Sequence, residues 1–123
     1  MATFDLKQLE AEDTTTVQLV HPATGDEIGA SITIYGQDSE VYRAEQRKAE
    51  TKFAEYSRRN RGKFMPPEDR ERMDKAKVVA CVKSVNDLSS DGQPVSAADA
   101  LAVPWIFEQV TAAMFDRSLF IKG

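Results

Sequence analysis

A chain of 123 residues, 41% hydrophobic and 29% charged, has the composition of one small globular domain, which we expect to span residues 1–123. Its net charge of −4 argues against nucleic acid or anionic lipid as a general partner, and no stretch approaches the roughly 18 apolar residues of a membrane span. The single cysteine, Cys81, excludes an internal disulfide, and the first residues lack the pattern of a signal peptide. We therefore expect a reducing cytoplasm.

Charge is distributed unevenly along the chain. Residues 1–39 contain one Lys and seven acids, a net charge of −6, whereas residues 40–63 contain eight basic residues and four Glu, a net charge of +4. Residues 64–123 contain seven basic residues and nine acids, a net charge of −2. The sequence thus has an acidic first part and a basic middle.

Residues 16–35 predict an antiparallel β-hairpin. The segment 16–20 is rich in β-branched residues, and His21–Asp26 contains a Pro and a Gly that can turn the chain. In the second strand, apolar residues occupy every other position, which predicts one buried face. The predicted buried residues are Ile28, Ala30, Ile32 and Ile34.

A long helix is expected over residues 39–61, a span without Pro and with good helix formers throughout. Asp38 or Ser39 can cap its first turn. One narrow apolar stripe runs along this helix, formed by Tyr42, Ala49, Phe53 and Tyr56. The remaining faces are expected to lie in solvent or against a partner.

The prolines at 66 and 67 separate this helix from a second one, expected over residues 67–86 with Cys81 and Val85 on its apolar side. A turn-rich loop is expected over 86–94. Residues 96–120 predict the C-terminal helices, because Ser96 and Asp99 form a capping box and Pro104 suits the first turn of a last helix. The predicted fold class is α+β, an N-terminal antiparallel hairpin followed by about four helices.

Motifs for catalysis are missing from this sequence. It has no glycine-rich phosphate-binding loop and no paired histidines. His21 lies beside a proline in a turn without nearby metal ligands, and Cys81 is expected to act as a small hydrophobic residue. A Cys81–His21 dyad is the one catalytic alternative. We expect no enzyme activity, no metal and no cofactor.

The basic part of the long helix allows two interpretations. Its positive side chains could contact phosphates, but Glu40, Glu45, Glu50 and Glu55 interrupt them, and Glu55 can pair with Arg59. A solvated helix face is the other interpretation. Basic and apolar residues side by side are typical of protein interfaces. The candidate partner interface is therefore Arg58, Arg59, Arg61, Lys63, Phe64 and Met65.

Three short motifs follow one another along the chain. The first is a hairpin motif formed by Leu19, Pro22, Thr24, Gly25, Ile28 and Gly29. A second motif, Ile32-x-Ile34-x-Gly36-x-Asp38-Ser39, opens the long helix. The third consists of an acidic-Gly turn at Asp91–Gly92, a helix led by Ser96 and an aromatic-rich end at Phe120. This order of motifs resembles the tail assembly chaperones of long-tailed, siphovirus-type bacteriophages.

The resemblance implies a protein that binds the aggregation-prone tape measure protein in the host cell cytoplasm and keeps it soluble. It also implies recruitment of the tail tube protein, through a longer form made by ribosomal frameshifting, and absence from the mature virion. Two alternatives remain: a structural tail or head–tail component retained in the virion, and a small nucleic-acid-binding regulator.

The uneven charge also predicts a homo-oligomer. The basic region 40–65 of one copy can meet the acidic region 1–39 of the next, and such a contact between two different patches generates a ring or a spiral. The alternative is a monomer whose charge asymmetry serves no contact.

Overall fold

A computed structural model of the chain describes residues 3, 6 and 12–121. The first antiparallel hairpin and four helices confirm the predicted α+β class. In chain order the elements are β1 (Thr14–Val20), β2 (Glu27–Tyr35), α1 (Glu40–Arg59), α2 (Pro67–Ala80), β3 (Val82–Asn86), β4 (Ser89–Ser90), β5 (Gln93–Pro94), α3 (Ala97–Leu101), α4 (Pro104–Met114) and the 3-10 turn η2 (Arg117–Leu119).

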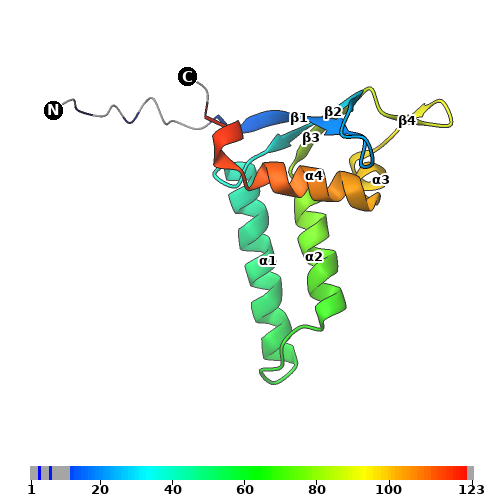
Figure 1. Cartoon of the computed structure of the whole chain (residues 1–123). Helices are drawn as coiled ribbons and strands as arrows, with labels where there is room; N and C mark the ends of the chain where they lie inside the picture. The colour runs from blue at the N-terminus through cyan, green and yellow to red at the C-terminus, as the bar shows by residue number, and fades with distance from the viewer. Residues whose placement is uncertain (1–2, 4–5, 7–11, 122–123) are drawn as a thin grey trace.

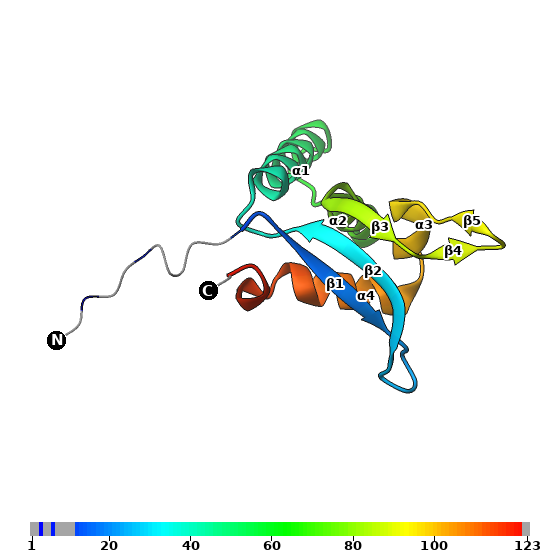
Figure 2. The ribbon, with the colours of Figure 1, turned by 90° about the horizontal axis from the view of Figure 1, so that it is seen from above.

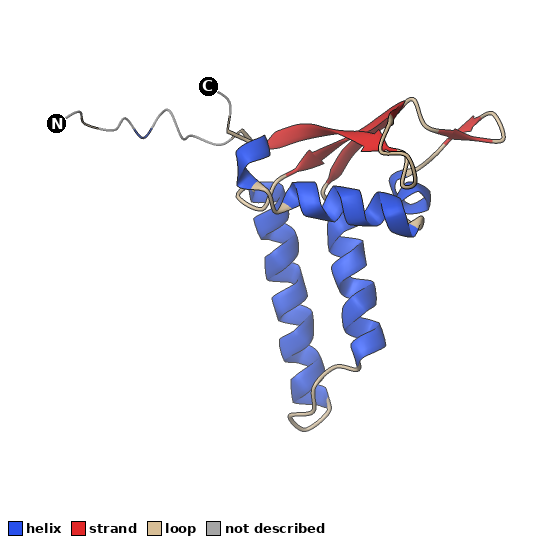
Figure 3. Cartoon of the chain, in the orientation of Figure 1, coloured by secondary structure: helices blue, strands red, loops and turns tan. Residues whose placement is uncertain are grey.

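Strands β1, β2 and β3 form an antiparallel sheet in that order, and the helices lie on one of its faces (Figures 1 and 3). Helix α4 runs beneath β1 and β2, as the view from above shows (Figure 2). Helices α1 and α2 extend away from the sheet as a long helical hairpin (Figure 1). The molecule therefore has a layered body and one projecting arm.

The core lies between the sheet and the helices α3 and α4. Alternation along β2 turns Ala30, Ile32 and Ile34 inward, as predicted, and Ile32 is 0% exposed. Helix α4 supplies Ile106, Val110 and Met114 from one stripe, since these residues recur at the helical period. Burial of these apolar side chains is the main stabilising term of the fold.

The prediction for Ile28 is wrong, because this side chain is 41% exposed. Gln18 pairs with Ser31, but Val20 pairs with Glu27, so β2 has extra residues at this point. Gly29 has φ +83 there, a conformation in which L side chains are strained. This β-bulge breaks the alternation and turns Ile28 outward.

The predicted helix over 67–86 is also wrong in its second part. Helix α2 ends at Ala80, and residues 82–86 form strand β3 against β2. Val82 and Val85 pair with Ile34 and Ile32, although a spacing of three is helical rather than alternating. A second register shift in β3 brings both valines opposite the buried residues of β2. Because of this bulge, two inward-facing valines of a strand are spaced three residues apart, as they would be in a helix.

The predicted N-terminal caps of two helices are confirmed. Ser39 Oγ accepts a hydrogen bond from Tyr42 N at 3.2 Å, and Ser96 Oγ accepts one from Asp99 N at 3.2 Å. The predicted loop over 86–94 contains the small hairpin β4–β5. Asp91 and Gly92 in its turn have φ 52 and φ 80, as a two-residue hairpin turn of the I′ type requires.

The C-terminal residues fasten the start of α1 to the body. Arg117 Nε donates to Asp38 Oδ2 at 2.8 Å, which lowers the pKa of the Asp38 carboxyl. The buried Phe120 ring lies so close to Gly36 that a Cβ on Gly36 would be 2.8 Å from the ring. Glu12 N donates to Phe120 O at 2.7 Å. Three contacts thus fix the C-terminal turn to the body.

Replacing either of two isoleucines of β2 with aspartate tests the bulge. Ile32→Asp places a charge in the core and should lower the free energy of unfolding by several kcal/mol. Ile28→Asp places the same charge at the surface and should cost less than about 1 kcal/mol. Denaturant unfolding of both variants measures the difference. Similar losses in the two variants would contradict the register described here.

Candidate functional site

The arm formed by α1 and α2 is held together partly by polar and cation–π contacts. The Arg70 guanidinium lies 5.2 Å from the centre of the Phe53 ring, and Lys77 Nζ lies 5.2 Å from that of Tyr42. Lys77 Nζ also donates to Gln46 Oε1 at 2.8 Å. Ala49 is the only buried residue of α1, and it is still 8% exposed. The arm therefore has little core of its own.

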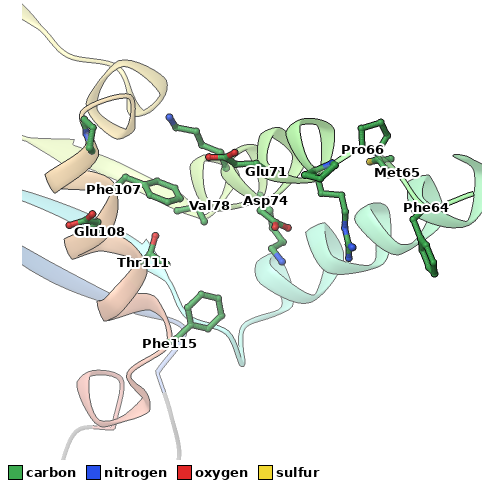
Figure 4. A pocket seen from close by; sticks show the side chains of 15 residues that line it. Phe64, Met65, Pro66, Glu71, Asp74, Val78, Phe107, Glu108, Thr111 and Phe115 are labelled. Atoms are coloured by element: carbon green, nitrogen blue, oxygen red, sulfur yellow. The ribbon is translucent and has the colours of Figure 1, made fainter.

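A groove of about 1150 Å³ runs along α2, from the α1–α2 loop at the far end of the arm to helix α4 in the body (Figure 4). Most of its lining is apolar and comes from three segments of the chain. The apolar lining residues are Phe64, Met65, Pro66, Pro67, Val78, Pro104, Phe107 and Phe115. Charged side chains of both signs also line it: Arg70, Glu71, Asp74, Lys75, Lys77 and Glu108.

Helix α4 presents a second stripe to this groove. Phe107, Thr111 and Phe115 are four residues apart and therefore lie on one face of the helix region. Lys75 Nζ lies 5.7 Å from the centre of the Phe107 ring. Thr111 Oγ1 is the single buried side-chain oxygen or nitrogen without a hydrogen-bond partner in the described part of the chain. The groove wall thus contains one unsatisfied polar atom among apolar groups.

The predicted interface residues divide into two groups in the structure. Phe64 and Met65 line the groove, and Phe64 is 90% exposed. The four cations lie at the tip of the arm instead: Arg58 and Arg59 end α1, and Arg61 and Lys63 lie in the following loop. The tip is defined here as residues 58–64.

The tip cations are free of ion pairs within the residues that the structure describes. The expected contact between Glu55 and Arg59 is therefore not formed. Arg61 and Gly62 have φ 54 and φ 82, and Gly62 N donates to Ser57 O at 2.7 Å, so the chain reverses sharply here. This reversal exposes the cations together with Phe64.

Sequence reasoning missed Phe107, Thr111 and Phe115 as groove residues. Their spacing of four was present in the sequence, but Ile106 and Val110 form another apolar stripe on the same helix with the same spacing. Only the position of the sheet decides which stripe enters the core.

The catalytic alternative lacks the necessary geometry. His21 is exposed in the β1–β2 turn, where its Nδ1 accepts hydrogen bonds from Ala23 N at 3.1 Å and Thr24 N at 3.3 Å. Cys81 is fully buried, and burial raises the pKa of its thiol to about 11, with the charge of Glu45 adding to the effect. A thiol with this pKa stays protonated at neutral pH and is a weak nucleophile.

The described residues contain no cluster of three or more His, Cys, Asp or Glu that could hold a metal ion. Over the same part of the chain, no helix combines the length and the apolar character that crossing a membrane requires.

The raised pKa of Cys81 predicts how stability responds to alkali. The unfolded thiol loses its proton near pH 9, before the folded one does, so the contribution is intact below pH 9 and is lost as the pH rises toward 11. Denaturant unfolding of the parent and Cys81→Ala across this range isolates the effect. The stability advantage of the parent should shrink above pH 9, and a constant difference would contradict the assignment.

The groove, with its apolar lining, and the tip, with its exposed cations and Phe64, are thus the two candidate surfaces for binding a partner. Comparisons with protein-family models, curated proteins and solved structures found no match to this chain.

Proposed function

We propose that this protein is a phage tail assembly chaperone, which binds the tape measure protein and keeps it soluble during tail morphogenesis. The observation that carries the proposal is the apolar groove beside the projecting arm. A tape measure protein is long and helical, and its exposed apolar stripes need temporary cover. An amphipathic helix lying in a hydrophobic groove is a recurrent mode of peptide recognition.

The charges around the groove suit such a client. Arg70, Lys75 and Lys77 alternate with Glu71, Asp74 and Glu108 at its edges, so both signs are available. A helix that presents an apolar stripe flanked by charged residues can bury the stripe and keep its own charges paired or solvated. The groove therefore favours many similar helical segments over one unique sequence.

In this proposal the protein is not an enzyme and works in the host cell cytoplasm. A longer frameshifted form would contact the tail tube protein, and the protein would be absent from the mature virion. The alternative of a retained tail or head–tail component differs in one measurable respect. Mass spectrometry of purified particles would detect a retained component and should find no copies of a chaperone.

The groove variant Met65→Ser/Phe115→Ser tests client binding. Removing an apolar group from each end of the groove should weaken burial of the client stripe. The chain should be co-expressed with the tape measure protein, which we expect to be encoded by a very long, helix-rich gene directly downstream. The soluble fraction of the client should be high with the parent and should fall severalfold with the variant.

Leu119→Ser is the matched control, because Leu119 is an exposed apolar residue outside the groove. Melting curves must show that all three proteins are folded. A client that stays insoluble with the parent, or one that the groove variant solubilises equally well, would refute the proposal.

A further inference from the structure

The tip of the arm combines exposed cations with an exposed aromatic side chain, as protein-binding surfaces often do. Within the described residues, four cations without ion pairs lie within six residues of Phe64 in the chain, and the Phe64 side chain is 90% exposed. Aromatic residues and arginines are enriched in the centres of protein interfaces. A large exposed aromatic ring is unfavourable in water, so a partner surface is expected to cover it.

A second pocket, of about 580 Å³, is lined by residues of the β4–β5 hairpin and of the helices α3 and α4. Its apolar lining consists of Leu88, Pro94, Val95, Ala100, Val103, Trp105 and Ile106. Asp99 lies at its edge without an ion pair, and Asp91 extends from the hairpin turn that borders it. We name it the hairpin pocket.

The segment of the chain that lines the hairpin pocket carries only acidic charges. Residues 84–116 contain five acids, at 87, 91, 99, 108 and 116, and no Lys, Arg or His. All residues that line the pocket belong to this stretch. The pocket therefore offers an apolar interior and a negative border, which is the complement of an aromatic ring among cations.

We propose that the tip of one copy docks into the hairpin pocket of a second copy. Phe64 would enter the apolar interior, while Arg58, Arg59 and Arg61 would lie against Asp91 and Asp99. Tip and pocket are different surfaces of the same chain, so the contact is heterologous and builds a ring or an open spiral. The inference concerns contacts between identical copies. Phe64 also lines the client groove, whereas Arg58, Arg59 and Arg61 do not, so changes at these arginines test the contact between copies alone.

The structure favours this pairing over the contact between residues 40–65 and 1–39 that charge alone suggested. Among the described acids of the first part, Asp38 already forms an ion pair with Arg117. Asp99, which lines the apolar hairpin pocket, has no ion pair among the described residues. Charge complementarity then coincides with an apolar contact, and such complementarity contributes to the specificity of an interface.

The contact is expected to be weak and sensitive to salt. A stable interface buries about 800 Å² on each partner, and a single loop end with one aromatic residue covers less than that. Exposed charges are screened over ~8 Å at physiological ionic strength. Self-association should therefore increase with protein concentration and decrease as salt is added.

Charge reversal with mixing tests the pairing. The tip variant is Arg58→Glu/Arg59→Glu/Arg61→Glu, and the pocket variant is Gln93→Lys/Asp99→Lys. Asp87 and Asp91 are left unchanged because both have positive φ, where substitution strains the backbone. Lys48→Glu/Lys52→Glu, on the exposed middle of α1, is the control for a general change of charge.

Sedimentation velocity at low salt should show concentration-dependent oligomers of the parent and the control. Each reversed variant alone should associate at least about tenfold more weakly, because like charges then face each other. An equimolar mixture of the two should regain association, since each tip again meets a pocket of opposite charge.

Three results would overturn the inference. The first is a parent that stays monomeric at high concentration and low salt, and the second is a mixture of two folded variants that fails to associate. The third is co-purification of the parent with nucleic acid that the tip variant loses, which would assign the tip to phosphate binding. None of these results depends on the tape measure protein, so the proposed client binding can fail or succeed separately.

Discussion

The sheet has only one apolar face, and α4 is the element that covers most of it. Val110 and Met114 of α4 pack under the residues of β2, and this contact determines the orientation of the helix. Because α4 carries a second stripe on another side, the same contact positions Phe107, Thr111 and Phe115 against the arm. The groove therefore exists as a consequence of how the core is closed.

The arm depends on the body for its stability. Helix α1 has one buried residue, Ala49, and helices in proteins gain most of their stability from tertiary packing. Its first turn is capped by Ser39 and fastened through Asp38 to Arg117. Its far end has only the Phe53–Arg70 contact and the chain reversal at Gly62 to hold it against α2. The tip is thus the least constrained part of the arm.

Local signals in the sequence predicted the elements whose geometry is local. The hairpin, the caps at Ser39 and Ser96 and the start of α4 at Pro104 follow from residues within a few positions of each other. The two wrong assignments, at Ile28 and at Val82–Asn86, both involve β-bulges. A bulge changes which side chains face the core, and its position depends on the partner strand rather than on the residues alone.

The candidate site, too, could be predicted from the sequence only in part. Phe64 and Met65 were recognisable because basic and apolar residues adjoin in the sequence. Phe107, Thr111 and Phe115 were not, since their role depends on which stripe of α4 the sheet occupies. The acidic surroundings of the hairpin pocket lie in residues 84–116, yet averaging the charge over 64–123 concealed them behind the lysines and arginines of α2.

The position of α4 and Phe120 so late in the chain has a consequence for synthesis on the ribosome. The hairpin β1–β2 emerges first, but β3 pairs with it only after the whole arm has been made, and α4 follows later still. Until then Ile32 and Ile34 lack the core residues that α4 supplies, and the nascent chain exposes part of an apolar strand face. Such surfaces are prone to aggregation in incomplete chains. The protein would itself need protection before its last helix leaves the ribosome.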